Sequence, residues 1–374
     1  MRHVTDDERR ARLAVRHALA PAFRAPTPEA VTRALTVLHA TEPATVYLTC
    51  RARAESLAIA DVDRALYTDR TLVKQLAMRR TLFVFPRDLL PAVWPSASAR
   101  VAATERAHIA RDVVRAGLTT DGDAWLDNAR AEVLAVLSGE PGGLPAGEIR
   151  RAAPGELWSA YRVLNHLGLT ADVVRGVNTG RWPTSRPRWT RMADWLGEAP
   201  PPWDPAAGYR ELIARWLRSF GPGTEDDLVW WLGSTKAVVR SALAELDAVA
   251  VTLDHGETGW LLPDDLDEVP DPGPWVALLP VLDPTVMGWK GRDFYLGPHR
   301  QHLFDRTGNA GTTAWVNGRV VGCWVQDETG AVEVRLLEDI TPAERRALES
   351  EAVKLTAWLD GVRVQTGYSS PAMI

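Results

Sequence analysis

The stretch that decides the fold runs from Tyr209 to Pro263 and reads YRELIARWLRSFGPGTEDDLVWWLGSTKAVVRSALAELDAVAVTLDHGETGWLLP. Its first part has apolar residues at helical spacing up to Phe220, where Gly-Pro-Gly ends the pattern. Thr224 is placed to cap a second helix, with Asp227 three residues on as in a capping box. Ser234 is placed to cap a third helix. The stretch therefore predicts three successive helices.

A hairpin is expected directly after these helices. The apolar residues of 249–262 predict two strands around the turn Asp254–Glu257. Three helices followed by a hairpin are typical of a winged helix, which commonly places its third helix in a DNA groove. Lys236 and Arg240 point outward on that helix and are candidate DNA contacts. Winged helices also serve as protein-binding modules, so the fold alone leaves both functions open.

Length and composition indicate a multidomain globular protein. The chain has 374 residues, which predicts two to four modules, and its 46% hydrophobic and 24% charged content is ordinary for a soluble protein. No apolar run approaches the length of a membrane span, and the N-terminus does not resemble a signal peptide, so we expect a cytoplasmic protein. Cys50 and Cys323 are too few for a disulfide framework or a zinc site, and we expect no metal and no cofactor.

The charge pattern neither excludes nor requires a nucleic-acid partner. A net charge of −5 argues mildly against a general polyanion binder, although clustered basic residues can outweigh the total. The basic residues are almost all arginines, whose planar fork suits phosphate. A GC-rich genome would give the same preference for arginine over lysine.

The other segments predict two further helix-and-hairpin units before the stretch and a β-rich domain after it. The first unit spans 1–95, with helices at 5–20, 27–39, 43–53 and 61–66 and a strand at 79–86 introduced by Arg79 and Arg80. The second spans 96–200, with helices at 98–117 and 125–137, a helix-turn-helix at 144–150 and 155–167, and a wing at 173–189. A proline-rich linker at 200–205 precedes the third unit, 206–265. The last domain, 272–374, has alternating strands, an Asn317-Gly318 hairpin turn, a helix at 341–359 and a final strand at 362–366.

The best nucleic-acid footprint is the second wing. The segment 175–191 contains no acidic residue, and its basic residues are Arg175, Arg181, Arg186, Arg188 and Arg191. Trp182 and Trp189 lie among them. Phosphates bind lines of cations, and unstacked bases bind aromatic faces, so the segment is a candidate DNA contact. The alternative is a solvated basic loop with both tryptophans packed inward.

The sequence His39-Ala40-Thr41-Glu42-Pro43 is the candidate for chemistry. His39 can exchange a proton near neutral pH, and Glu42 can activate water. The same residues also suit helix ends, with His39 at a helix C-terminus and Thr41 as an N-cap before Pro43. Both interpretations remain open from spacing alone. His299 and His302 are one helical turn apart but have no evident third ligand, so a surface pair is expected there.

Several motifs together resemble a known family over nearly the full chain. They are LHATEPAT at 38–45, MRRTLFVFP at 78–86, FGPGTEDDLVWWLG at 220–233, LLPVLDP at 278–284 and GRVVG at 318–322. In this order they resemble the AlkZ/YcaQ-like bacterial DNA glycosylases. The resemblance implies an α+β protein of three tandem winged helices followed by a small C-terminal β-barrel-like domain.

The resemblance also implies an activity. Family members are monofunctional glycosylases that excise N7-alkylated purines from duplex DNA, including bulky antibiotic adducts and interstrand crosslinks, and some confer self-resistance on antibiotic producers. Their catalytic pair is two side chains around one apolar residue, usually Gln and Gln or Gln and Asp, and here His39 and Thr41 take those positions. Glu42 is the carboxylate that could complete the set. We expect a monomer acting on adducted double-stranded DNA, with no membrane partner. The alternatives are a non-catalytic DNA-binding protein, such as a regulator or lesion-binding factor, and a protein scaffold.

Overall fold

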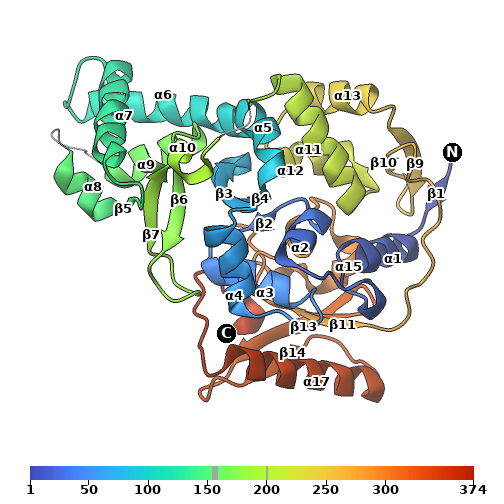
Figure 1. Ribbon diagram of the computed structural model, residues 1–374. Helices are drawn as coiled ribbons and strands as arrows, with labels where there is room; N and C mark the ends of the chain where they lie inside the picture. The colour runs from blue at the N-terminus through green and yellow to red at the C-terminus, as the bar shows by residue number, and fades with distance from the viewer. Residues whose placement is uncertain (154–158, 199–200) are drawn as a thin grey trace. The chain divides into compact units, whose positions relative to one another are not determined.

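The computed structural model (Figure 1) describes residues 1–153, 159–198 and 201–374, and its contacts divide the chain into two compact units. One unit combines Met1–Val62 with Ile213–Ile374 and is called the terminal unit, since it holds both ends of the chain. The other, Asp63–Leu212, is called the central unit. Residues 155–158 of the predicted second helix-turn-helix and residue 200 of the predicted linker lie outside the described residues. The predicted four-domain division is finer than these two units and stays a prediction.

The central unit contains two hairpins and a group of helices. The first hairpin pairs β3 (Leu72–Ala77) with β4 (Thr81–Pro86), so the predicted strand at 79–86 has a partner that the sequence pattern did not suggest. The second pairs β6 (Val173–Asn178) with β7 (Pro187–Arg191), and the short β5 (Leu144–Pro145) adds to β7. The helices are α5 (Leu90–Val93), α6 (Ala99–Arg115), α7 (Gly122–Ser138), α8 (Ala146–Ala152), α9 (Ala160–Leu169), α10 (Met192–Leu196) and the first half of α11 (Pro205–Phe220). Two π-helical turns, Arg64–Thr68 and Trp94–Ser98, lie at either side of the first hairpin.

One apolar cluster joins the second hairpin to its helices. Ile109 and Val113 of α6 pack with Val133 of α7 and with Leu164 of α9, and Trp189 of β7 fills the same cluster. These positions follow helical spacing, which is why the sequence pattern located the helices correctly. The hairpin is therefore anchored through its buried face, while its connecting loop, residues 179–186, extends beyond the sheet.

The terminal unit contains the stretch Tyr209–Pro263 from Ile213 onward. The second half of α11 is followed by β8 (Gly223–Thr224), α12 (Glu225–Leu232), α13 (Lys236–Glu245) and the hairpin of β9 (Val249–Leu253) with β10 (Thr258–Leu261). The predicted capping box is confirmed, because the side chains of Thr224 and Asp227 each accept from the other's backbone. The cap of α13 is Thr235 rather than Ser234. The sheet order is β1-β9-β10-β8, with β1 (His3–Val4) added parallel to β9.

The N-terminal part of this unit is helical, with one change from the predicted pattern. Its elements are α1 (Asp6–Arg16), α2 (Pro28–Ala34), β2 (Leu38–His39), α3 (Pro43–Arg51) and α4 (Ile59–Asp63). The helix predicted to reach residue 39 ends at Ala34. Thr36 has a φ of 64°, and its hydroxyl donates to the carbonyl of Arg215 at 3.1 Å. This left-handed residue ends the helix and turns the chain into β2.

The C-terminal part is an open sheet and not the barrel-like domain that the resemblance implied. Its four antiparallel strands have the order β11 (Val276–Leu279), β12 (Thr313–Val316), β13 (Arg319–Gln326) and β14 (Val332–Leu336). Among the described residues, no strand pairs β11 with β14; instead α17 (Pro342–Leu359) packs against both edge strands. A helix that covers the two edges takes the place of barrel closure. The Asn317-Gly318 turn between β12 and β13 is confirmed.

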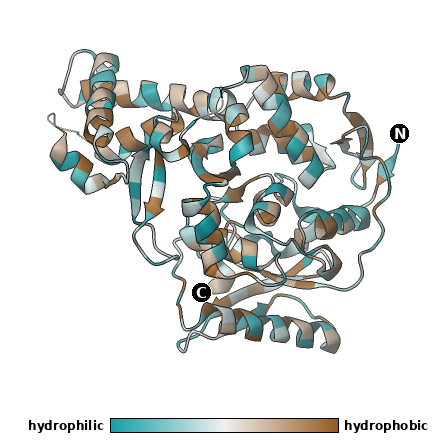
Figure 2. Cartoon of the chain, in the orientation of Figure 1, coloured by the Kyte–Doolittle hydropathy of each residue, from teal (hydrophilic) through white to brown (hydrophobic). Residues whose placement is uncertain are grey.

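The distribution of hydrophobic residues explains why α17 packs against the C-terminal sheet. The two inner strands, β12 and β13, are mostly hydrophobic, whereas α17 mixes brown and teal along its length (Figure 2). Its buried residues are Leu348, Ala352, Leu355 and Leu359, at the spacing of one helical face. Three shorter helices complete this part, namely α14 (Pro284–Met287), α15 (Asp293–Leu296) and α16 (Arg300–Leu303).

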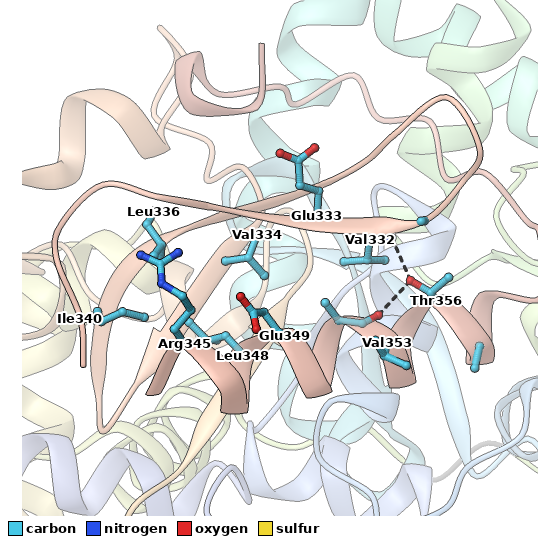
Figure 3. Close-up of a pocket in the computed structure, with 13 residues that line it drawn as sticks. Val332, Glu333, Val334, Leu336, Ile340, Arg345, Leu348, Glu349, Val353 and Thr356 are labelled. Atoms are coloured by element: carbon cyan, nitrogen blue, oxygen red, sulfur yellow. Dashed lines mark hydrogen bonds between the residues drawn. The ribbon is translucent and has the colours of Figure 1, made fainter. Parts of the chain in front are cut away.

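An apolar groove of about 620 Å³ lies between β14 and α17 (Figure 3). The backbone N–H of Val332 donates to the Thr356 hydroxyl at 2.8 Å, and that hydroxyl donates to the Ala352 carbonyl at 2.9 Å. These bonds join the strand to the helix at one end of the groove. Val334 and Leu348 line its floor, and Val353 is exposed beside it.

A buried ion pair links two segments of the terminal unit that are far apart in sequence. Arg53, just after α3, donates to both carboxylate oxygens of Asp283, at 2.9 and 2.7 Å, and both residues are fully buried. Asp283 also accepts from the Thr49 hydroxyl at 3.0 Å and from the Thr285 backbone N–H at 2.9 Å. The bidentate geometry and the extra donors pair the two charges inside the core, and only Nε of Arg53 has no hydrogen-bond partner among the described residues.

Candidate active site and nucleic-acid interface

The segment with His39 forms the bend between β2 and α3. His39 belongs to β2 and is 7% exposed, Ala40 is buried, and Thr41 is exposed. The backbone nitrogen of Thr41 lies 3.5 Å from Nδ1 of His39, at the outer limit of a hydrogen bond in which the ring accepts. His39 is therefore held at the end of a strand and not at a helix C-terminus.

Glu42 stands at the N-cap position of α3, but its side chain makes no cap hydrogen bond there. Its Oε1 atom accepts instead from the Thr366 hydroxyl at 2.9 Å and from the backbone N–H of Gly367 at 2.7 Å. Burial raises the pKa of Glu42, and these two hydrogen bonds oppose that rise. The C-terminal segment of the chain therefore fixes the direction of this carboxylate.

Glu42 lines a cavity of about 580 Å³ between α3, the C-terminal sheet and the last residues of the chain. Thr45 and Leu48 of α3, Trp324 of β13 and Gln365 form other parts of its wall. Its size is within the range of small-molecule sites. Among the described residues that line this cavity, neither His39 nor Thr41 is present. The structure thus places Glu42 in a cavity and leaves the other two candidate catalytic residues outside its lining.

Gln326 holds the C-terminal segment against the sheet. Its Nε2 donates to the Val362 carbonyl at 3.0 Å, and its Oε1 accepts from the Val364 N–H at 2.8 Å. The strand predicted at 362–366 is therefore wrong, because a side-chain amide, rather than a neighbouring strand, takes up these backbone groups. These two hydrogen bonds of Gln326 hold the segment in which Thr366 and Gly367 contact Glu42.

In the central unit, Arg79 and Arg80 form the turn of the β3–β4 hairpin. Their φ angles are 54° and 58°, a left-handed conformation that is uncommon for residues other than glycine. Arg80 pairs with Glu105 of α6 at 3.2 Å. Positive φ values at successive positions are typical of tight β-hairpin turns, so the turn itself accounts for this conformation.

The basic hairpin β6–β7 has one buried and one exposed part. Trp189 is 3% exposed within the apolar cluster, and its cross-strand partner Arg175 has its guanidinium 5.2 Å from the Trp189 ring centroid. Trp189 thus faces the core and offers no surface to a base, and Trp182 is half-buried in the connecting loop. The inward packing that the sequence left open applies to Trp189.

The arginines of this hairpin divide in the same way. Arg188 donates to the carbonyls of Gly142 and Gly143, and Arg191 pairs with Asp194 at 2.6 Å. Arg181 and Arg186 are exposed in the connecting loop. Their charges are therefore the ones that the loop presents to solvent.

Tyr161 is an exposed aromatic residue that the sequence analysis missed. It lies at the start of α9, is 62% exposed, and its ring centroid is 6.0 Å from the Arg175 guanidinium. A hydrogen bond with Asn165 is the main cause that lowers the pKa of Tyr161, and the charges of Arg175 and Arg80 act in the same direction. The helical spacing could have found this residue, because Val163 and Leu167 face inward and leave Tyr161 on the outer face.

The candidate contacts on α13 are already paired with acidic side chains of α12. Lys236 lies 3.3 Å from Glu225 and 3.1 Å from Asp226, and Arg240 lies 2.6 Å from Glu225. Their charges are locally compensated, which weakens this helix face as a phosphate-binding surface. Elsewhere in the terminal unit, His299 is buried and bonded to Glu338 at 2.7 Å, and thus is not part of an exposed histidine pair.

Comparison with known proteins gives a family and a fold. The family model described as DNA glycosylase AlkZ-like matches residues 32–358, which is most of the chain and includes the segment from His39 to Glu42. The structure is similar to that of the Streptomyces sahachiroi DNA glycosylase AlkZ, with a TM-score of 0.79 and 22% sequence identity over 97% of this chain and 99% of that chain. No curated protein matches the sequence. Among the described residues, no helix is long and apolar enough to cross a membrane.

Proposed function

The chain belongs to the AlkZ-like DNA glycosylase family, and we propose that it hydrolyses the N-glycosidic bond of alkylated or bulky-adducted purines in double-stranded DNA. N7-guanine adducts are the first candidates, and interstrand crosslinks are the bulkiest. The protein would act as a monomer in DNA repair or in self-resistance to a DNA-alkylating antibiotic. The observation that carries the proposal is the carboxylate of Glu42, fixed by Thr366 and Gly367 at the wall of a cavity next to the family's catalytic positions.

The proposed reaction needs a base but no strong acid. Water attacks C1′ of the deoxyribose while the C1′–N9 bond breaks and its electron pair passes to the purine. Because N7 alkylation has already made the purine cationic, the purine leaves as a neutral molecule without prior protonation. The proton lost by the water passes to Glu42, whose raised pKa makes it a stronger base than an ordinary glutamate. The glutamate charge also stabilises the positive charge that develops on the sugar.

His39 and Thr41 take supporting roles in this proposal. A neutral imidazole can orient the water by hydrogen bonding or accept its proton, as a glutamine would at the same position. The Thr41 hydroxyl is exposed and offers one further donor or acceptor.

DNA binding is proposed through helix-and-hairpin modules of the winged-helix kind, at 1–95, 96–200 and 206–265. In two of them a short strand before the second helix pairs with the following hairpin, as β5 does with β7 and β8 with β10. Exposed arginines at 181 and 186 would contact phosphates, and Tyr161 with Arg175 would contact a base or sugar. Arg79 and Arg80 of the β3–β4 turn are further candidate contacts, with Arg80 partly compensated by Glu105, and Trp189 is left out because it is buried.

The proposal is tested by base release from duplex DNA that carries N7-methylguanine or a bulky N7-guanine adduct, scored as alkali-labile abasic sites. We expect the wild-type protein to produce abasic sites and His39→Ala to produce them more slowly, because the imidazole that orients the attacking water is lost. Tight binding without abasic sites, across a panel of adducts, would instead establish a non-catalytic lesion-binding protein.

The proposed contact by the β6–β7 loop makes a salt-dependence prediction. Replacing Arg181 and Arg186 together with glutamine is expected to lower the slope of log affinity against log salt for duplex DNA by about two, since each phosphate contact contributes about 0.9. Affinity is measured by fluorescence anisotropy across a salt series.

The matched control for that experiment is Arg130→Gln. Arg130 is also an arginine of the central unit, but its guanidinium is bonded to Asp172 at 2.8 Å. Its replacement is expected to leave the slope unchanged. Equal slopes for the wild type and the double variant would remove the loop from the interface.

A further inference from the structure

A second pocket of the terminal unit holds two buried arginines. It measures about 290 Å³ and is formed by α1, the start of α12, the β9–β10 turn and residues 290–300. It shares no described lining residue with the cavity beside Glu42. No role in the proposed hydrolysis involves it.

Arg292 is the deeper of the two arginines. It is 3% exposed, and its guanidinium lies between two aromatic rings, 4.8 Å from the centroid of Trp230 and 4.8 Å from that of Phe304. Its Nε and Nη2 atoms are buried and have no hydrogen-bond partner among the described residues. A buried guanidinium is costly unless an anion or several acceptors satisfy it. Burial lowers the pKa of Arg292, and the charge of nearby Arg300 acts in the same direction.

Arg9 of α1 supplies a second buried cation. It is 8% exposed, and its guanidinium stacks on Phe294 at 3.6 Å from the ring centroid. One of its nitrogens contacts Asp6 at 3.3 Å, but its buried Nε has no partner among the described residues. Two arginines from elements far apart in sequence therefore line one pocket, and each has a buried N–H group without a partner among the described residues.

The acidic residues of the lining are hydrogen-bonded to other groups or exposed. Asp227 accepts from the backbone of Lys290 and Gly291 with one oxygen and from Thr224 with the other. Asp226 is paired with Lys290 and Lys236. The remaining two, Glu257 and Asp293, are exposed. Asp227 is the buried carboxylate of the lining, and its charge partly compensates those of Arg9 and Arg292.

We propose that this pocket binds a phosphate group through Arg292 and Arg9, with Lys290 and Arg300 at its rim. Phosphate suits the site because guanidinium groups bind its oxygens bidentately and because it has enough oxygens for donors arriving from two sides. The same chemistry could come from a phosphodiester of a DNA strand or from a free phosphate. The inference does not depend on the glycosylase activity.

The test measures the melting temperature of the full-length protein with increasing inorganic phosphate, at ionic strength held constant with chloride. A ligand of the native state raises the melting temperature with concentration. We expect a saturable rise for the wild type and an apparent affinity roughly tenfold or more weaker for Arg300→Gln, as for a lost hydrogen bond to a charged group. Arg319→Gln is the control, since Arg319 is exposed and paired with Glu338, away from the pocket.

Arg292→Met separates binding from a purely structural role. If Arg292 binds an anion and is not needed for folding, its replacement by an apolar side chain keeps or raises the melting temperature in phosphate-free buffer. The same replacement abolishes the phosphate-dependent rise in melting temperature. A large fall of the melting temperature in phosphate-free buffer would mean that Arg292 is a structural residue and would overturn the proposal.

A salt series with duplex DNA identifies the source of the phosphate. A slope lowered by about one in Arg300→Gln indicates a DNA phosphodiester. An unchanged slope together with a lost response to inorganic phosphate indicates a free phosphate. The proposal fails if Arg300→Gln and Arg292→Met match the wild type in both the phosphate response and the DNA slope.

Discussion

Replacing Glu42 with glutamine is expected to slow the release of N7-methylguanine from duplex DNA by about 100-fold or more, the usual range for loss of a general base. Glutamine keeps the size of the side chain and an oxygen that can still accept from Thr366 and Gly367, so the local structure is retained. Only the negative charge and the proton acceptor are lost. The measurement is the single-turnover rate with enzyme in excess over DNA.

The pH profile gives this prediction a second readout. Burial raises the pKa of Glu42, so the carboxylate becomes protonated at a higher pH than an ordinary glutamate does as the solution is acidified. The wild-type rate is therefore expected to fall on the acid side, beginning above the usual glutamate range, and Glu42→Gln is expected to lack that limb. Glu349→Gln, on the exposed side of α17, is the control. A wild-type rate in Glu42→Gln would contradict the proposed base.

The second large effect is on stability. Asp283→Ala is expected to lower the free energy of unfolding of the terminal unit by about 3–5 kcal/mol, because it leaves the charge of Arg53 buried without a partner. For a unit of this size that corresponds to a fall in melting temperature on the order of 10 °C. Thermal unfolding followed by tryptophan fluorescence measures it.

A double variant controls for the loss of packing. Arg53→Met with Asp283→Leu removes both charges and keeps most of the volume, and we expect it to recover much of the lost stability. Equal destabilisation in the single and the double variant would show that shape, and not the unpaired charge, is what the core requires.

Local signals in the sequence predicted local structure well. The Thr224–Asp227 capping box, the Asn317-Gly318 turn and the helical face of α17 depend on residues within one or two turns of each other. Hydrophobic spacing likewise located most helices, because burial of one face sets that spacing.

The candidate site could be predicted only as a list of residues. The direction of the Glu42 side chain depends on Thr366, which lies 324 residues away in the sequence. No local pattern around Glu42 predicts that contact. Alternation along β7 could not tell whether Trp189 faces the core, because a shift of one residue exchanges the two faces of a strand. The prediction of a barrel-like domain was wrong for a related reason. The strands were located, but the packing of α17 across both edges is a tertiary feature.

The path of the chain through the terminal unit has a consequence for synthesis. The central unit is contiguous, so all of its residues have been translated once Leu212 has been added. Thr366 and Gly367, the partners of Glu42, are added on the order of ten seconds later at ordinary rates of translation. A nascent chain therefore carries His39 and Glu42 long before the segment that orients the carboxylate exists. A product that terminates between Leu212 and Thr366 contains every residue of the central unit but lacks the hydrogen-bond donors that fix Glu42.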